Sequence, residues 1–150
     1  MILARNIQKS YGDIHVLNGI DMDIPQGQII SIIGKSGAGK STLLHILGTL
    51  DTPDTGTLAI CDKDITGLNE KQLAAFRNKN IGFVFQFHHL LQEFTAIENV
   101  CIPAYIAGKS ESESTQKAKE LLEYLGLSDR MNHKPQQMSG GEAQRVAVAR

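Results

Sequence analysis

The chain has 150 residues, with 15 Lys and Arg against 16 Asp and Glu, which gives a formal net charge of −1. Hydrophobic residues make up 41% and charged residues 21%, a globular composition that excludes disordered, collagen-like and low-complexity proteins. The balanced charge argues against binding of nucleic acid through a basic surface, and no apolar run approaches the ~18 residues of a membrane-spanning helix.

The first part of the chain combines glycine-rich turns with short apolar runs, a pattern that predicts an α/β fold. Strands are expected at residues 2–7, 20–24, 29–33, 57–61 and 81–85. The runs 29–33 and 81–85 are almost wholly apolar, so we expect both to be strands buried on both faces. Helices are expected at residues 40–47, after a glycine-rich loop, and from Asn69 to about residue 78. Asn69 and Gln72 fit a capping box.

From residue 87 onward the pattern predicts helices and no strand. A capping box at Thr95 begins a helix that extends to about residue 106. Residues 109–116 are rich in Ser and Glu and are predicted to be an exposed loop. A further helix ends at Gly126, and the last begins near Gly140. We therefore expect two lobes of one domain, an α/β lobe at residues 1–86 and a helical lobe at residues 87–150.

Neither the two cysteines nor the two aspartates that follow Cys61 are interpreted as metal ligands. Cys61 and Cys101 lie far apart and fit no metal-binding spacing, so we interpret both as buried, reduced thiols rather than as a disulfide or redox pair. Asp62 and Asp64 are interpreted as carboxylates of a surface turn.

Residues 34–41 read Gly-Lys-Ser-Gly-Ala-Gly-Lys-Ser, which fits the pattern G-x-x-x-x-G-K-[ST] of a phosphate-binding loop. The glycines let backbone amides converge on phosphate oxygens, and the following helix adds the positive end of its dipole. Lys40 places a cation on the β- and γ-phosphates, and Ser41 offers its hydroxyl to Mg²⁺. The alternative is a glycine-rich turn without a ligand. The predicted nucleotide-binding residues are Gly34, Lys35, Ser36, Gly37, Ala38, Gly39, Lys40, Ser41 and Thr42.

A second glycine-containing segment, residues 138–145, reads Met-Ser-Gly-Gly-Glu-Ala-Gln-Arg. Taken alone, Ser139 and Glu142 form an ordinary capping box on the last helix. Capping does not require two glycines in the first turn, and glycine there weakens a helix. The glycines are explained if a ligand approaches the bare backbone. We interpret the segment as an anion site that completes the nucleotide site of another copy of the chain.

A phosphate loop followed by this Ser-Gly-Gly segment resembles the nucleotide-binding domain of ABC transporters. The resemblance implies a P-loop NTPase (RecA-like) core with an antiparallel β subdomain and an α-helical subdomain. It implies that Tyr11 stacks on adenine and that Gln86 contacts Mg²⁺ and the attacking water. Met138 departs mildly from the family's usual Leu, as Glu142 does from the frequent Gln. The residues that would contact the γ-phosphate of ATP on the opposite subunit are Ser139, Gly140, Gly141 and Glu142.

Residues 82–100 indicate a subgroup within this family. The run Gln-Phe-His-His-Leu-Leu within them is similar to the ATPases of lipoprotein-releasing systems. Macrolide-exporter and cell-division ATPases resemble the rest of the segment almost as well. In this group, His88 and His89 would lie on the face that docks a coupling helix of the membrane partner, rather than serving as metal or catalytic ligands.

The resemblance implies an ATP- and Mg²⁺-dependent ATPase that couples energy to transport. Two copies would sandwich two ATP molecules and act on integral membrane subunits at the cytoplasmic face of the inner membrane, without nucleic acid. The expected cargo is lipoproteins released from the inner membrane, and the first alternative is a macrolide-exporter-like or cell-division ABC ATPase. A soluble superfamily member acting in DNA repair or translation is also considered, although no long insertion is visible. A non-catalytic nucleotide-binding regulator is the second alternative.

No residue of this chain is assigned as the general base. In the family an apolar strand ending in Asp-Glu follows the Ser-Gly-Gly helix, and its counterpart is expected beyond Arg150. We therefore expect the domain to be incomplete at its C-terminus, with the run 29–33 lacking a neighbouring strand. The isolated chain is expected to fold poorly or aggregate, and otherwise to bind nucleotide weakly with negligible hydrolysis.

Overall fold

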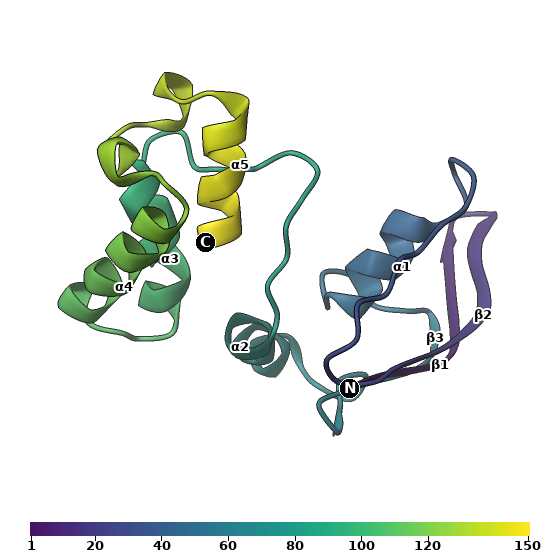
Figure 1. The fold of residues 1–150 in the computed structure, drawn as a ribbon. Helices are drawn as coiled ribbons and strands as arrows, with labels where there is room; N and C mark the ends of the chain where they lie inside the picture. The colour runs from purple at the N-terminus through teal and green to yellow at the C-terminus, as the bar shows by residue number, and fades with distance from the viewer. The chain divides into compact units, whose positions relative to one another are not determined.

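The computed structural model describes residues 1–150, which divide into two compact units, Met1–Ile81 and Gly82–Arg150. Figure 1 shows strands in the first unit and helices alone in the second. The division falls a few residues before the one expected after residue 86, so residues 82–86 belong to the helical unit.

The first unit is built on a four-stranded antiparallel sheet with the order β2-β1-β3-β4. The antiparallel sheet that the sequence predicted is therefore confirmed. A two-residue turn joins β1 to β2, with Tyr11 opposite Ile14 and Gly12 at φ 58°. The strands are β1 (Ile2–Tyr11), β2 (Ile14–Ile24), β3 (Thr55–Ile60) and β4 (Lys63–Asp64).

The turn between β3 and β4 explains one wrong prediction. Cys61 and Asp62 take φ values of 50° and 61°, as a primed two-residue hairpin turn requires. Cys61 is therefore exposed rather than buried, whereas Cys101 is buried and both thiols are free. Asp62 and Asp64 lie exposed at this hairpin, as the sequence predicted.

Two helices cover this unit. Helix α1 (Lys40–Leu47) buries Leu43, Ile46 and Leu47 in a core shared with apolar side chains of β1, β2 and β3. Helix α2 (Glu70–Asn80) begins with the predicted capping box. The Asn69 side chain accepts from the amide of Gln72 at 2.9 Å, and the Gln72 side chain accepts from the amide of Asn69 at 3.1 Å. Both helices begin where the sequence placed them.

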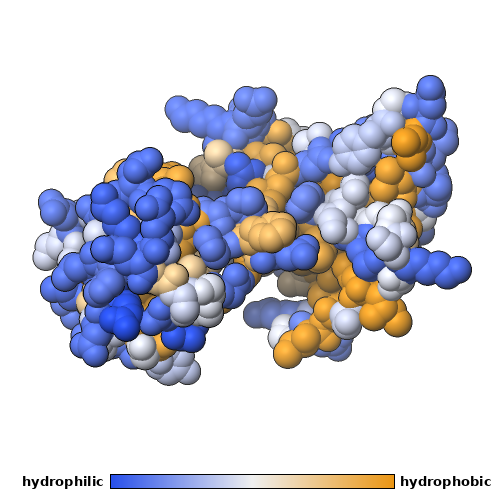
Figure 2. Space-filling model, turned by 90° about the horizontal axis from the view of Figure 1, so that it is seen from above, coloured by the Kyte–Doolittle hydropathy of each residue, from blue (hydrophilic) through white to orange (hydrophobic).

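The two strands predicted at residues 29–33 and 81–85 are not formed. Neither segment pairs with any other part of residues 1–150, and the side chains of Ile29 and Ile33 are 100% and 87% exposed. Figure 2 shows such apolar side chains at the surface of the molecule. A β-branched run supplies the propensity for a strand, but the ladder requires a partner strand, and the described chain offers none.

The second unit is a helical cluster with its own core. Its helices are α3 (Ala96–Ile106), α4 (Glu111–Tyr124) and α5 (Gly140–Ala149), with short 3₁₀ turns η1 (Ser128–Arg130) and η2 (Pro135–Gln137). Figure 1 shows α3, α4 and α5 lying side by side, and buried side chains of all three share one core. None of the helices in residues 1–150 is long and apolar enough to cross a membrane.

The loop predicted at residues 109–116 is instead the start of α4. Ser110 is the N-cap, and its hydroxyl accepts from the amide of Glu113 at 3.2 Å. Glu111 and Glu113 in the first turn suit the positive end of the helix dipole. The polar composition that suggested a loop is therefore the signature of a capped, solvent-exposed helix start.

Buried Asn99 holds the segment that precedes α3. Its side chain accepts from the amide of Leu91 at 2.8 Å and donates to the carbonyls of Leu91 and Phe94 at 3.1 and 3.2 Å. Asn99 is fully buried, so these bonds satisfy a polar group that would otherwise destabilise the core. The side-chain amide of Asn99 therefore holds the path of residues 91–95.

We predict that the exposed run 29–33 drives self-association of the chain. Replacing Ile29 and Ile33 together by Lys places charge on an apolar segment of high β-propensity, which opposes strand-to-strand pairing. Light scattering is expected to fall, while urea unfolding shifts by less than about 0.5 kcal/mol. The control is Ile7→Ala, in the core, expected to lose ~2–5 kcal/mol. Unchanged scattering in the double lysine variant would contradict the prediction.

Candidate functional site

The glycine-rich loop forms a hollow at the N-terminus of α1. Its lining consists of residues 36–42 together with Val16 of β2, and its volume is about 280 Å³. Gly37 and Gly39 take φ values of 79° and 81°, in the left-handed region. The amide of Ala38 donates to the carbonyl of Lys35 at 3.2 Å, which closes the turn. The predicted loop thus folds into a concave backbone surface directly before a helix.

Gly39 is the position where the loop can carry no side chain. A Cβ there would lie 2.9 Å from side-chain atoms of both Val16 and Leu17 and 3.0 Å from the Val16 carbonyl. Gly39 is also the N-cap of α1 and is left-handed, so a larger residue is excluded both by strain and by contact. This close packing against β2 fixes where the first turn of the helix begins.

Lys40 folds back over the loop. Its ammonium donates to the carbonyls of Gly34 and Lys35 at 2.9 and 2.7 Å. An ammonium has three donors, so one remains for an anion at the mouth of the hollow. Ser41 follows in the exposed first turn, which contains no acidic residue. The site therefore presents backbone amides, one held cation and a free hydroxyl without an opposing carboxylate.

A resident metal site is absent from residues 1–150. No group of three or more His, Cys, Asp or Glu side chains could hold an ion. The Ser41 hydroxyl alone is a weak ligand, but it fits a Mg²⁺ ion that arrives with nucleotide phosphates, because Mg²⁺ takes most of its ligands from phosphates and water.

Tyr11 belongs to the same unit as the phosphate loop. Its hydroxyl donates to Asp51 at 2.7 Å, and the ammonium of Lys9 lies 5.3 Å from the ring centroid. The hydrogen bond to Asp51 is the main reason that the pKa of Tyr11 is raised. Thr42, a residue that lines the hollow, acts on the same hydroxyl and by itself lowers its pKa. Tyr11 therefore stands beside the loop with 49% of its surface exposed.

Gln86 and the Ser-Gly-Gly segment lie in the second unit, apart in sequence from the loop. Gln86 is exposed in a bend that follows the aromatic pair Phe83 and Phe85, whose ring centroids are 4.6 Å apart. His89 packs edge-on against Phe85, and the Arg150 guanidinium donates to the backbone carbonyl of His89 at 2.9 Å. These contacts order the segment around Gln86 and His89 inside the helical unit.

Ser139 caps α5 in the predicted manner. Its amide donates to Glu142 at 2.7 Å, and its hydroxyl accepts from the amide of Glu142 at 3.3 Å. Gly140 and Gly141 are exposed in the first turn. A Cβ at Gly140 would meet nothing within 4 Å, and at Gly141 only Arg145 at 3.9 Å. The fold itself therefore does not require these two glycines, unlike Gly39.

Glu142 is held on both sides within its own unit. One carboxylate oxygen accepts from the Ser139 amide, and the other accepts from Nε of Arg130 in η1 at 2.9 Å. The Ser139 amide first, and then Arg130, lower the pKa of Glu142 to about 2. Both oxygens are engaged and the charge is paired, so Glu142 acts in this structure as a brace for the start of α5.

Several site residues were missed at the sequence level. Val16 lines the hollow, Lys9 and Asp51 hold Tyr11, and Arg130 holds Glu142. No motif marks these residues. The structure groups the loop residues 34–42 with Tyr11 in one unit, and Gln86 with residues 139–142 in the other.

Known proteins resemble the chain over its whole length. A family model described as "ABC transporter" matches residues 17–150. The lipoprotein-releasing system ATP-binding protein LolD of Bacteroides thetaiotaomicron is 61% identical over 100% of this chain and 69% of its own length. The LolD of Cytophaga hutchinsonii is 57% identical over 100% and 68%. The dimeric ATP-binding cassette MJ0796, solved after hydrolysis with ADP and Pi, gives a TM-score of 0.91 at 39% identity over 99% of this chain and 68% of that one.

Glu142 is expected to make unfolding pH-dependent in the acid range. Its folded pKa, about 2, lies below the ordinary value of 4.5, so its stabilising contribution is complete above pH ~4.5 and disappears as the pH falls toward 2. Urea unfolding of the chain and of Glu142→Gln should therefore differ most near neutral pH and converge on acidification. Glu113→Gln, on the exposed start of α4, is the control. A difference that does not change with pH would contradict the assignment.

Proposed function

The chain belongs to the family of ABC transporter ATP-binding proteins, and on that premise we propose that it is the ATP-binding, energy-coupling subunit of a lipoprotein-releasing transport system. One structural observation supports this proposal above all others. The loop at residues 34–42 forms a concave backbone surface with the Lys40 ammonium held over it. The identity to LolD proteins along the whole chain supports the lipoprotein-releasing assignment.

The phosphate chain of ATP would lie in the hollow of the first unit. Loop amides and the N-terminus of α1 bind its oxygens, and the remaining donor of Lys40 reaches the β- and γ-phosphates. Ser41 would hold Mg²⁺, which would supply positive charge to the phosphate chain. Tyr11 stacks on adenine at the rim of the hollow, and Gln86 contacts the Mg²⁺ and the attacking water.

The Ser139 segment would act on the nucleotide of a second copy of the chain. The hydroxyl of Ser139 and the bare amides of Gly140 and Gly141 form an anion-binding helix start, and nothing in their own unit needs the two glycines. The dimeric state of the cassette MJ0796 supports an arrangement in which each ATP lies between one loop and the opposite Ser139 segment. We propose that Glu142 braces this segment instead of making the γ-phosphate contact that the resemblance implied, because Arg130 and the Ser139 amide engage both of its carboxylate oxygens.

Membrane subunits would dock on the second unit. Phe87 is 70% exposed beside His88 and His89, whose backbone Arg150 holds in place. We propose that this segment receives a coupling element of an integral membrane partner at the cytoplasmic face. Closure of two copies on ATP then drives the partner, and hydrolysis resets the pair.

ATP binding by the phosphate loop is the first test. Lys40→Ala removes the only side-chain cation held over the loop, so the affinity for Mg-ATP should fall by at least tenfold. This affinity is measured by titrating a fluorescent ATP analogue with the monomeric fraction of the protein. Lys71→Ala, an exposed lysine of α2, is the matched control and should bind as the parent does. Equal affinity in parent and Lys40→Ala would remove the proposed function.

Residues 1–150 alone are expected to hydrolyse ATP negligibly. The first turn of α1 contains no carboxylate, and Asp51 is engaged by Lys9, Tyr11 and the Thr52 amide. Neither the loop nor its neighbours therefore supplies a general base for water. Phosphate release should equal that of Lys40→Ala at saturating Mg-ATP. Turnover at ordinary ABC ATPase rates that depends on Lys40 would contradict this expectation.

A further inference from the structure

An ion pair between a buried lysine and a partly exposed carboxylate joins the end of β1 to the loop that follows α1. Lys9 is only 9% exposed, and its ammonium donates to Asp51 Oδ1 at 2.9 Å and to the Thr52 carbonyl at 2.7 Å. The carboxylate of Asp54 lies 3.7 Å away. A lysine this buried is destabilising unless its charge is paired, so these contacts hold the loop in one place.

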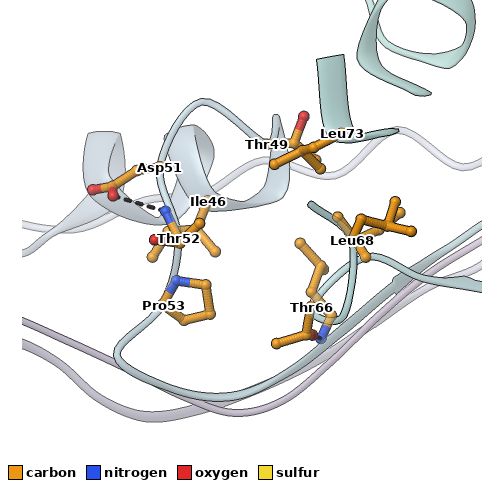
Figure 3. Close-up of a pocket in the computed structure, with 10 residues that line it drawn as sticks. Ile46, Thr49, Asp51, Thr52, Pro53, Thr66, Leu68 and Leu73 are labelled. Carbon is orange, nitrogen blue, oxygen red and sulfur yellow. Dashed lines mark hydrogen bonds between the residues drawn. The ribbon is translucent and has the colours of Figure 1, made fainter. Parts of the chain in front are cut away.

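Asp51 uses its second oxygen for Tyr11. Oδ1 accepts from Lys9 and from the Thr52 amide at 2.7 Å, and Oδ2 accepts from the Tyr11 hydroxyl at 2.7 Å. Figure 3 shows the Asp51 carboxylate turned away from the middle of a small cavity that Ile46 and Leu68 also line, with its bond to Thr52 dashed. The carboxylate is therefore directed to the end of β1, where Lys9 and Tyr11 lie.

The same pair orients the aromatic ring. The Lys9 ammonium lies over the ring at 5.3 Å from its centroid, while the Asp51 contact fixes the hydroxyl. Lys9 lies on one side of the ring and 49% of the Tyr11 surface is exposed, so part of the ring stays accessible to a ligand.

From this geometry we propose that Lys9 and Asp51 are positioning residues that pre-orient the Tyr11 ring to stack on the base of the bound nucleotide. The inference deepens the proposed function and rests on it. A tyrosine at a strand end next to a turn would otherwise sample several rotamers, and ordering it on binding would lower the affinity. The ion pair between Lys9 and Asp51 orders the Tyr11 side chain before the ligand binds, so this loss of rotamer freedom does not reduce the affinity. The pair does this without contacting the ligand.

The test separates base recognition from phosphate recognition. Asp51→Asn should weaken ATP binding about tenfold, the scale of one base–aromatic stack, and should leave inorganic tripolyphosphate within about twofold. Tripolyphosphate has no base, so it reports the loop alone. Asp13→Asn, an exposed carboxylate in the adjoining turn, is the matched control and should change neither affinity.

Tyr11→Phe provides a variant that does not endanger the fold. It keeps the ring and removes only the hydroxyl that Asp51 binds, so ATP binding should weaken about threefold with tripolyphosphate unchanged. The double variant Asp51→Asn/Tyr11→Phe should bind ATP no more weakly than Asp51→Asn alone, because both changes break one contact.

Three results would overturn the inference. Equal loss of ATP and tripolyphosphate affinity in Asp51→Asn would mean that the pair only maintains the fold of the loop. Unchanged ATP affinity in both Asp51→Asn and Tyr11→Phe would mean that Tyr11 needs no positioning. If the parent chain binds neither ligand in a Lys40-dependent way, the proposed nucleotide site fails, and this inference fails with it.

Discussion

The turn at Gly39 is the constraint on which the candidate site depends. A left-handed glycine there lets the loop pass within contact distance of Val16 and Leu17 and start α1 at once. One residue thus ties three elements together, the strand β2, the phosphate loop and the helix. The hollow, the held position of Lys40 and the exposed first turn of α1 follow from that junction, since each is set by where the helix begins.

Local signals in the sequence predicted local structure well. The capping boxes at Asn69, Thr95 and Ser139 each formed, because a cap involves residues three positions apart and needs no distant partner. The loop predicted at 109–116 was wrong for a reason of the same kind. Ser110 and Glu113 have capping spacing too, but the polar composition of the segment outweighed it.

The runs 29–33 and 81–85 show the limit of such signals. Their composition is that of buried strands, yet a strand is defined by its neighbour, and no other segment of residues 1–150 pairs with either run. Prediction of the candidate site from sequence is limited in the same way. Its phosphate loop and Ser-Gly-Gly segment are contiguous motifs, whereas the contacts of Lys9 with Asp51 and of Arg130 with Glu142 join residues far apart in sequence. Such pairs follow only from the fold.

The first turns of α1 and α5, which would both face phosphate, differ in how they avoid repulsion between a carboxylate and the incoming anion. A carboxylate in the first turn opposes an incoming anion even though it suits the helix dipole. Helix α1 has no acidic residue there, and its first turn relies on Lys40. Helix α5 has Glu142, but Arg130 pairs its charge and the Ser139 amide occupies its other oxygen. A capping carboxylate is thereby retained while the bare amides of Gly140 and Gly141 stay open to an anion.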